Sequence, residues 1–323
     1  MKVTFDGFFD LQVNGFAGVD FSDPEITRDS IGHASDAIRL SGVTRYLATL
    51  ITSTTHSFAQ CAKAIVASEN PTIAGIHMEG PYISPLDGAR GAHLRDYVTA
   101  ASIDDFERRQ EAADGHIVLV TLAPEVPGAL ALIEHLVKRN VRVAIGHTDA
   151  TPAGIADAIN AGATLSTHLG NGCPQMLPRH PNIIWEQLAA DALHMSLIVD
   201  GHHLPAATVK AMVRAKGAER TMLVTDATAA AGCNPGTFTL AGVGVELDAE
   251  GRVAVPGAKN LAGSALAMNA AVGNTVRFTG MTLSDVLPMS SSIPAAYLGL
   301  STAGRVLADW DEASCRLKIE RVE

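Results

Sequence analysis

The sequence predicts an α/β fold, a (β/α)8 barrel in which eight parallel strands alternate with helices. Three observations predict it: eight short apolar runs recur along the chain, helix-like segments separate most of them, and polar side chains follow six of the runs. A doubly wound open sheet is the structural alternative. The apolar runs span residues 5–13, 45–49, 72–77, 117–122, 142–147, 164–168, 196–199 and 221–225.

The helix-like segments between these runs have recognisable ends. Several begin at a proline or a capping side chain and end near glycine or asparagine. In the segment 127–140, Ala131, Leu132, His135 and Leu136 would share one face, as expected for a helix that lies on a sheet. The segments span residues 26–41, 56–68, 102–112, 127–140, 152–161 and 205–216.

The last part of the chain departs from this alternation. Residues 237–247 alternate apolar and polar side chains, and after a turn residues 253–255 complete a predicted β-hairpin. Helix-like segments follow at 264–279 and 283–300. We therefore expect a barrel over residues 1–304, followed by short, charged C-terminal strands over 305–323.

Composition indicates a compact soluble enzyme, because 47% of the 323 residues are hydrophobic and 18% are charged. The net charge of −10 argues against a nucleic-acid-binding face. Cys61, Cys173, Cys233 and Cys315 form no CxxC pair, which is typical of reduced cytosolic thiols. The chain shows neither a signal-peptide core nor an apolar run of about 18 residues, so we expect a cytoplasmic protein without a membrane span.

Polar side chains at the strand ends supply the candidate chemistry. Glu79 follows the third run, His147 and His168 end the fifth and sixth, and Asp226 follows the eighth. In a parallel barrel these ends meet at one rim, where active sites lie. Unrelated polar residues, or a helix N-cap in the case of Asp226, are the alternatives. One carboxylate and two imidazoles with an open position suit a catalytic metal site.

The motifs HMEGP, GHTDA, THLGN, DGHH and TDATAAAG occur in this order and resemble those of the N-acetylglucosamine-6-phosphate deacetylase family, in the amidohydrolase superfamily. The resemblance implies that Glu79, His147 and His168 bind one divalent metal ion. Zinc is the first choice, and iron, manganese and cobalt also accept this ligand set. Asp226 would be the general base that takes a proton from the attacking water and returns it to the departing amine.

Gln12 and Asn14 occupy the positions where many superfamily members have a His-x-His motif for a second metal. Amides bind divalent metals poorly beside imidazole or carboxylate, so we expect a single metal ion. His77 precedes Glu79 by two residues and would face the same side of a straight strand. It either supports the metal site or is a core histidine.

The resemblance also implies a substrate site. His93 would polarise the carbonyl of the acetamide, and Arg179, from this subunit or a neighbouring one, would bind the phosphate. A planar guanidinium suits phosphate because it donates two parallel hydrogen bonds, although Arg179 could also be a solvated loop cation. The residues expected to contact the substrate are Ala92, His93, Asn171, Gly172, Arg179 and His203.

The chain departs from the family pattern in two places. Family members follow the second metal-binding histidine with Leu-Phe/Tyr-Asn-Ala-Met, whereas residues 169–173 read Leu-Gly-Asn-Gly-Cys, so we expect a changed pocket wall. Cys173 would pack beside that wall and not act as a nucleophile. Members also usually carry a preceding segment that joins the C-terminal strands in a small β-sandwich, which we expect to be absent or reduced here.

The predicted function is deacetylation of an N-acetylated amino-sugar phosphate, converting N-acetylglucosamine-6-phosphate to glucosamine-6-phosphate and acetate. A homodimer or higher homo-oligomer is expected, with no nucleic-acid or membrane partner. One alternative is hydrolysis of another amide: an unphosphorylated N-acetyl sugar, an N-acyl amino acid or a cyclic amide. Another is a metal-free barrel, either an aldolase or isomerase or a non-catalytic sugar binder. No lysine stands at the eight strand ends, which argues against a Schiff-base aldolase.

Overall fold

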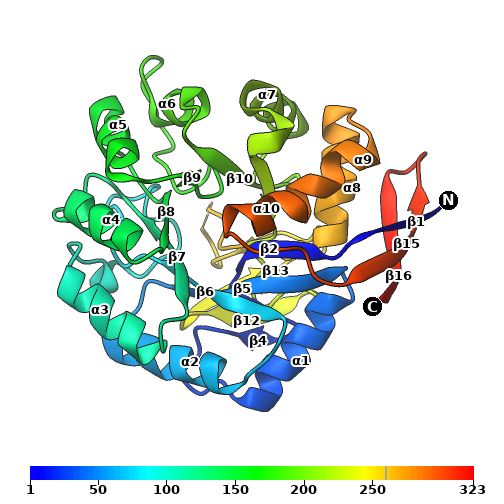
Figure 1. Ribbon diagram of the computed structural model, residues 1–323, viewed down its shortest axis with the longest axis horizontal. Coiled ribbons are helices and arrows are strands. Elements are labelled where there is room, and N and C mark those ends of the chain that lie inside the picture. The colour runs from blue at the N-terminus through cyan, green and yellow to red at the C-terminus, as the bar shows by residue number, and fades with distance from the viewer. Residues whose placement is uncertain (259) are drawn as a thin grey trace.

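The computed structural model describes residues 1–258 and 260–323, and its eight-stranded parallel sheet has the curvature of a barrel ringed by helices (Figure 1). The predicted (β/α)8 barrel is confirmed. The strands lie in the order β11-β10-β9-β8-β7-β6-β5-β2. Their bounds are Phe8–Val13 (β2), Val43–Ile51 (β5), Ile73–Glu79 (β6), Ile117–Leu122 (β7), Arg142–Ile145 (β8), Leu165–Ser166 (β9), His194–Ile198 (β10) and Thr221–Val224 (β11).

The barrel closes where β2 meets the residues that follow β11. The Asp226 N–H donates to the Gln12 carbonyl at 2.9 Å, and the Asn14 N–H donates to the Ala227 carbonyl at 2.7 Å. A parallel bridge joins Val13 and Ala227. This closure places Asp226, at the end of the last strand, beside the first strand.

The outer helices begin and end largely as their capping residues require. Thr27, Thr54, Ser102 and Thr151 each accept a hydrogen bond from a first-turn backbone N–H of the helix that follows. The helices are α1 (Arg28–Arg39), α2 (Thr55–Ala67), α3 (Ile103–Ala112), α4 (Ala129–Lys138), α5 (Pro152–Ala161), α6 (Ile183–Ala189), α7 (Ala206–Lys216) and α8 (Met268–Thr279).

The buried face of α4 differs from the predicted one. Leu132 and Leu136 are buried as expected, and Ile133 is buried with them. Ala131 is exposed and His135 is half-buried, with its Nε2 2.6 Å from Glu107 Oε1. The stripe that faces the sheet is therefore rotated toward Ile133, the larger apolar side chain.

The first predicted strand, residues 5–13, is two strands. Gly7 separates β1 (Lys2–Asp6) from β2, and an added Cβ there would lie 2.2 Å from the Thr44 side chain. β1 pairs antiparallel with β15 (Arg305–Asp311), which pairs with β16 (Arg316–Val322). The N-terminal strand thus joins the C-terminal strands in a three-stranded sheet beside the barrel (Figure 1).

Other segments also differ from expectation. The sequence did not predict α6, and the segment 283–300 divides into α9 (Leu283–Val286), a 3-10 turn (Leu287–Ser290) and α10 (Ser292–Tyr297), because Pro288 has no N–H with which to extend α9. The predicted hairpin has three strands. The remaining elements are β12 (Gly236–Leu240), β13 (Val243–Leu247), β14 (Val253–Ala254), β3 (Gly15–Phe16), β4 (Val19–Asp20) and the 3-10 turns Arg95–Tyr97 and Ala218–Arg220.

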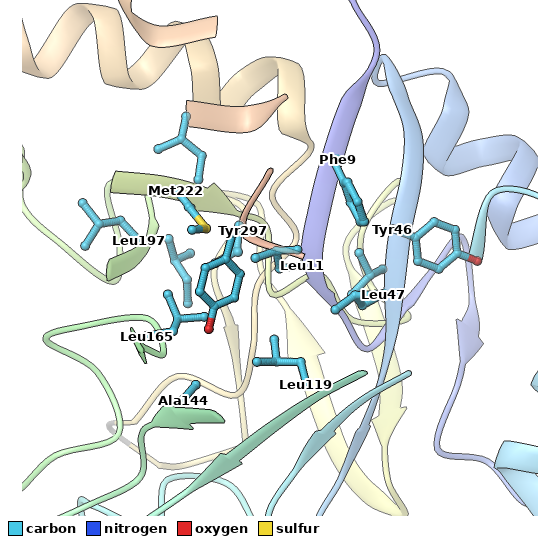
Figure 2. Close-up of a cluster of buried hydrophobic side chains, with 14 of the residues drawn as sticks. Phe9, Leu11, Tyr46, Leu47, Leu119, Ala144, Leu165, Leu197, Met222 and Tyr297 are labelled. Carbon is cyan, nitrogen blue, oxygen red and sulfur yellow. The ribbon is translucent and has the colours of Figure 1, made fainter. Parts of the chain in front are cut away.

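Apolar side chains from most of the barrel strands form the core. Figure 2 shows Leu11, Leu119, Leu165 and Leu197 gathered with Tyr297 of α10. All five side chains are buried. A second cluster packs the β12–β13–β14 sheet against the rim; it contains Ile51, Ala230, Leu240, Val245, Leu247, Val253 and Ala262.

Candidate metal centre and active site

A cavity of about 440 Å³ opens among the loops that follow the barrel strands. Glu79 is the last residue of β6, while His147, His168 and Asp226 come just after β8, β9 and β11. All four side chains line the cavity. The structure thus brings together the four strand-end residues that the sequence singled out.

Glu79, His147 and His168 present three ligand atoms to one another. Glu79 Oε1 lies 3.2 Å from His147 Nε2 and 3.1 Å from His168 Nε2, and the two ring nitrogens are 3.2 Å apart. In a tetrahedral zinc site with bonds of about 2.0–2.1 Å, neighbouring ligand atoms lie about 3.3 Å apart. The spacing and the donor types therefore fit a divalent metal ion.

The ring of His147 is oriented by its surroundings. Its Nδ1 lies 2.9 Å from the Ala89 carbonyl, which can only accept, so Nδ1 carries the proton and Nε2 keeps its lone pair for a metal. A Cβ added at Gly172 would lie 2.9 Å from Nδ1, and one at Gly91 would lie 3.2 Å from the ring. Only glycine leaves room for the ring at position 172. The sequence did not single out Ala89, because any residue type supplies a carbonyl.

Three of the rim residues have a backbone conformation that is rare outside glycine. The φ angles are 50° at His147, 30° at His168 and 51° at Asp226. Each residue comes just after its strand ends, so the chain turns sharply there. Such conformations persist where the surroundings impose them, and they cluster at functional sites.

The cluster has strongly altered electrostatics. Burial alone would raise the pKa of Glu79, but the contacts of its carboxylate with the imidazole groups of His147 and His168 outweigh burial and hold that pKa well below its ordinary value. Burial opposes the charged form of His168, yet the contact with Glu79 leaves its pKa raised. The Glu79 carboxylate is thus ionised and available as a metal ligand.

Gln12 and Asn14 donate hydrogen bonds to the carboxylates of the site. Asp226 Oδ1 accepts from Asn14 Nδ2 at 2.7 Å and from Gln12 Nε2 at 3.0 Å, and Gln12 Nε2 lies 2.9 Å from Glu79 Oε1. Burial, and then repulsion from Glu79, raise the pKa of Asp226 to about 6. No helix begins directly after Asp226, so the helix N-cap alternative for this residue is wrong.

His93 reaches the same centre from the loop after β6. Its Nδ1 lies 2.7 Å from Thr52 Oγ1, and its Nε2 lies 3.9 Å from Glu79 Oε2. Burial, followed by the neighbouring His147, lowers the pKa of His93 to about 3, so the ring is neutral. The Thr52 hydroxyl lies closer to Nδ1 than to its other acceptor, the Glu79 carbonyl at 3.4 Å. Donation by this hydroxyl to Nδ1 leaves the ring proton on Nε2, where it can donate.

The expected substrate contacts are divided between the cavity and its surroundings. Ala92, Asn171, Gly172 and His203 line the cavity, as His93 does. His203 Nδ1 lies 2.6 Å from Asp200 Oδ2, a partner to which the sequence reasoning assigned no role although it begins the DGHH motif. Arg179 is exposed and is not among the described residues that line the cavity.

The Leu-Gly-Asn-Gly-Cys segment, residues 169–173, contributes to the wall of the cavity. Gly170 and Cys173 line the cavity, and burial raises the pKa of the Cys173 thiol, which disfavours a nucleophilic thiolate. Ile51 and Leu240 supply apolar wall that the sequence reasoning did not identify. Leu240 comes from the β12–β13–β14 sheet, and an apolar strand residue carries no local signal of a binding site.

The chain matches the Amidohydrolase family over residues 6–311. It is 33% identical to the N-acetylglucosamine-6-phosphate deacetylase of Bacillus subtilis (strain 168), over 93% of this chain and 76% of the relative. It is 34% identical to the N-acetylgalactosamine-6-phosphate deacetylase of Escherichia coli O157:H7, over 91% and 77%. The crystal structure of N-acetyl-D-glucosamine-6-phosphate deacetylase from Mycobacterium smegmatis superposes with a TM-score of 0.91 at 30% identity, over 100% and 86%.

Among the described residues, no helix has the length and apolar character needed to cross a membrane. The family match covers most of the chain, and its relatives share the fold that carries the Glu79, His147 and His168 cluster. The chain therefore belongs to the N-acetylglucosamine-6-phosphate deacetylase family of the metal-dependent amidohydrolases.

Proposed function

We propose that this protein hydrolyses the acetamide of N-acetylglucosamine-6-phosphate to give glucosamine-6-phosphate and acetate. The observation that carries the proposal is the convergence of a Glu79–His147–His168 cluster with Asp226 in one cavity. The cavity, about 440 Å³, has the size of a small-molecule site. Relatives bearing this name align with more than nine-tenths of the chain.

Glu79, His147 and His168 would bind one divalent cation, with zinc as the first choice and iron, manganese and cobalt as the other ions this ligand set accepts. When bound, the cation would polarise the amide carbonyl and lower the pKa of a water molecule. Gln12 and Asn14 donate N–H groups to the carboxylates of the site, and amides bind divalent cations poorly beside imidazole or carboxylate, which supports a single cation.

Asp226 would accept a proton from the attacking water and return it to the departing amine. A carboxyl whose pKa lies near 6 suits both transfers near neutral pH, since it can gain and lose a proton at small cost. The hydrogen bonds from Gln12 and Asn14 hold Oδ1, which leaves Oδ2 for the transfer.

His93 would donate from Nε2 to the oxygen of the amide carbonyl as negative charge develops there. A neutral, buried imidazole fixed by Thr52 is a preorganised donor, and such donors stabilise an oxyanion more than water does. Its distance of 3.9 Å from Glu79 leaves it beside the metal-binding cluster.

We assign the phosphate end of the substrate to Asn171, Gly172, His203 and Arg179. Asp200 accepts a hydrogen bond from Nδ1 of His203 and so fixes the orientation of this ring in the wall of the cavity. Arg179 lies outside the cavity of its own chain, so we propose that it reaches the phosphate of a neighbouring subunit in a homodimer or higher oligomer.

A second candidate substrate is N-acetylgalactosamine-6-phosphate. The relative from Escherichia coli O157:H7 that is named for this sugar is 34% identical to the chain, and the Bacillus subtilis relative named for N-acetylglucosamine-6-phosphate is 33% identical. Both sugars present the same acetamide and phosphate, so the mechanism above is unchanged.

Acetate release by the zinc-loaded protein tests the proposal. The panel contains the 6-phosphates of N-acetylglucosamine and N-acetylgalactosamine, and both free sugars as matched controls. We expect a higher kcat/KM for at least one phosphorylated sugar than for its free counterpart. Acetate release from neither phosphate would refute the proposal, and equal rates with and without phosphate would refute the phosphate subsite.

A further inference from the structure

A chain of three buried polar side chains crosses the barrel interior next to the metal-binding cluster. His77 Nε2 lies 2.7 Å from Thr121 Oγ1, which lies 2.7 Å from Thr167 Oγ1. His77 and Thr121 belong to β6 and β7, and Thr167 follows β9. We call these three hydrogen-bonded side chains, His77, Thr121 and Thr167, the polar chain. All three are buried, and none has a role in the proposed mechanism.

Two members of the polar chain adjoin metal-binding residues along the backbone. His77 precedes Glu79 by two residues on β6, so the two side chains leave the strand on the same face. Thr167 is bonded directly to His168. A shift of either side chain would therefore move the backbone that carries a ligand.

The polar chain contacts the backbone next to the third metal-binding residue, His147, through packing. A Cβ added at Gly146 would lie 2.8 Å from both Thr121 Cγ2 and Thr167 Cβ, so only glycine fits between these threonines. Gly146 directly precedes His147. One hydrogen-bonded unit thus adjoins the backbone of all three metal-binding residues.

Thr121 holds the polar chain together because its hydroxyl has a partner on each side. A hydroxyl carries one hydrogen, so it donates to one neighbour and accepts from the other. Without it, a ring nitrogen of His77 and the Thr167 oxygen would be buried and unpaired. The other ring nitrogen of His77 lies 3.4 Å from Thr49 Oγ1, which accepts from the Val13 N–H at 3.1 Å. The connection therefore extends to β5 and β2.

We propose that His77, Thr121 and Thr167 are positioning residues that fix the spacing of the metal ligands and so set the metal affinity. The inference rests on the proposed metal site. Ligands must be held close to their productive geometry by neighbours whose own rotamers are fixed, and loss of such outer partners typically weakens metal binding about 10–100-fold. A role in fold stability alone is the competing interpretation.

Thr121→Val tests the inference, because valine keeps the shape of threonine and removes the hydroxyl. Thr121→Ser restores the hydroxyl. Thr275→Val is the matched control: Thr275 is equally buried and donates to the Ala271 carbonyl at 2.8 Å, but it lies on α8. Zinc affinity is measured by competition with a chelator, the melting temperature by calorimetry, and ligand geometry by the visible spectrum of the Co²⁺-substituted protein.

We expect Thr121→Val to bind zinc at least about tenfold more weakly than the parent and to change the Co²⁺ spectrum. Thr121→Ser should recover most of the affinity. Thr275→Val should lower the melting temperature and leave both metal readouts unchanged. If Thr121→Val does not fold, Thr167→Val applies the same test at the end of the polar chain, where only one partner is lost.

Parental zinc affinity and an unchanged Co²⁺ spectrum in Thr121→Val and Thr167→Val, with only a lower melting temperature, would overturn the inference and leave a purely structural role. Failure of the parent protein itself to bind zinc is a different result. It would refute the proposed metal site, and this inference with it.

Discussion

Asn14 Nδ2 lies 2.7 Å from Asp226 Oδ1, which ties the proposed base to the first barrel strand. A hydrogen bond to a carboxylate stabilises its charged form and lowers its pKa. This contact therefore opposes burial and Glu79, which together raise the pKa of Asp226 to about 6. The Asn14 N–H therefore acts directly on the proposed base.

Asn14→Leu should move the acid limb of kcat/KM to higher pH. The active form of Asp226 is ionised, so activity is present above its pKa and lost as pH falls through it. In the parent the limb should lie at or below about pH 6, because a bound cation stabilises the carboxylate further. Asn274→Leu is the control: it removes an amide on α8 that donates to the Val199 carbonyl, and it should leave the limb in place. A limb that does not move in Asn14→Leu would contradict Asp226 as the titrating base.

Asp226→Asn should retain the metal and lose roughly two or more orders of magnitude in turnover, because the amide cannot accept the proton. Elemental analysis and acetate release measure the two properties on the same sample. Turnover close to that of the parent would return Asp226 to a structural role.

The barrel and its rim were predictable because their signals are local. Residues 117–122 and 152–161 were predicted with the bounds that β7 and α5 have; Thr151, Pro152 and Gly162 supply the cap, first turn and end of α5. The pairing of β1 with β15 was not predictable, because it joins the two ends of the chain. The seven-residue helix α6 is too short for a clear helical period.

The site was predictable only as far as residue type reveals it. Histidine, glutamate and aspartate at the ends of predicted strands can be recognised as candidate site residues from the sequence. The four residues chosen in this way, Glu79, His147, His168 and Asp226, lie in one cavity. The Ala89 carbonyl that orients His147 has no side-chain signal. The double donation by Gln12 depends on how the barrel closes, and the exposed position of Arg179 depends on a loop; neither has a local pattern.

Glu79→Gln should abolish tight metal binding, since it removes the only anionic ligand of the cluster. A ligand at 100 times its Kd stabilises a folded protein by about 2.7 kcal/mol, so saturating zinc should raise the parental melting temperature. The variant should show little of this rise. Glu125→Gln is the matched control, because Glu125 accepts from Thr148 beside the site without being a ligand. Equal zinc-dependent rises in the parent and Glu79→Gln would place the metal elsewhere.

Arg179→Ala should lower kcat/KM for the phosphorylated sugar by at least about tenfold, or roughly 1.4 kcal/mol, and scarcely change it for the free sugar. Arg214→Ala, which removes another exposed arginine, should affect neither. If Arg179 acts across a subunit interface, mixing Arg179→Ala with Glu79→Gln should restore part of the activity, because some hybrid sites then have both halves intact. Equal losses on both sugars would exclude Arg179 as a phosphate contact.

The most direct test of the account is a zinc titration of the chelator-stripped protein, with acetate release from N-acetylglucosamine-6-phosphate as the readout. Gln12 and Asn14 direct N–H groups at the carboxylates, so a single cation is expected. The rate should rise from near zero and reach a plateau at about one equivalent of zinc per chain. A full rate in the stripped protein, or a plateau only at two equivalents with both ions in the active site, would contradict the account.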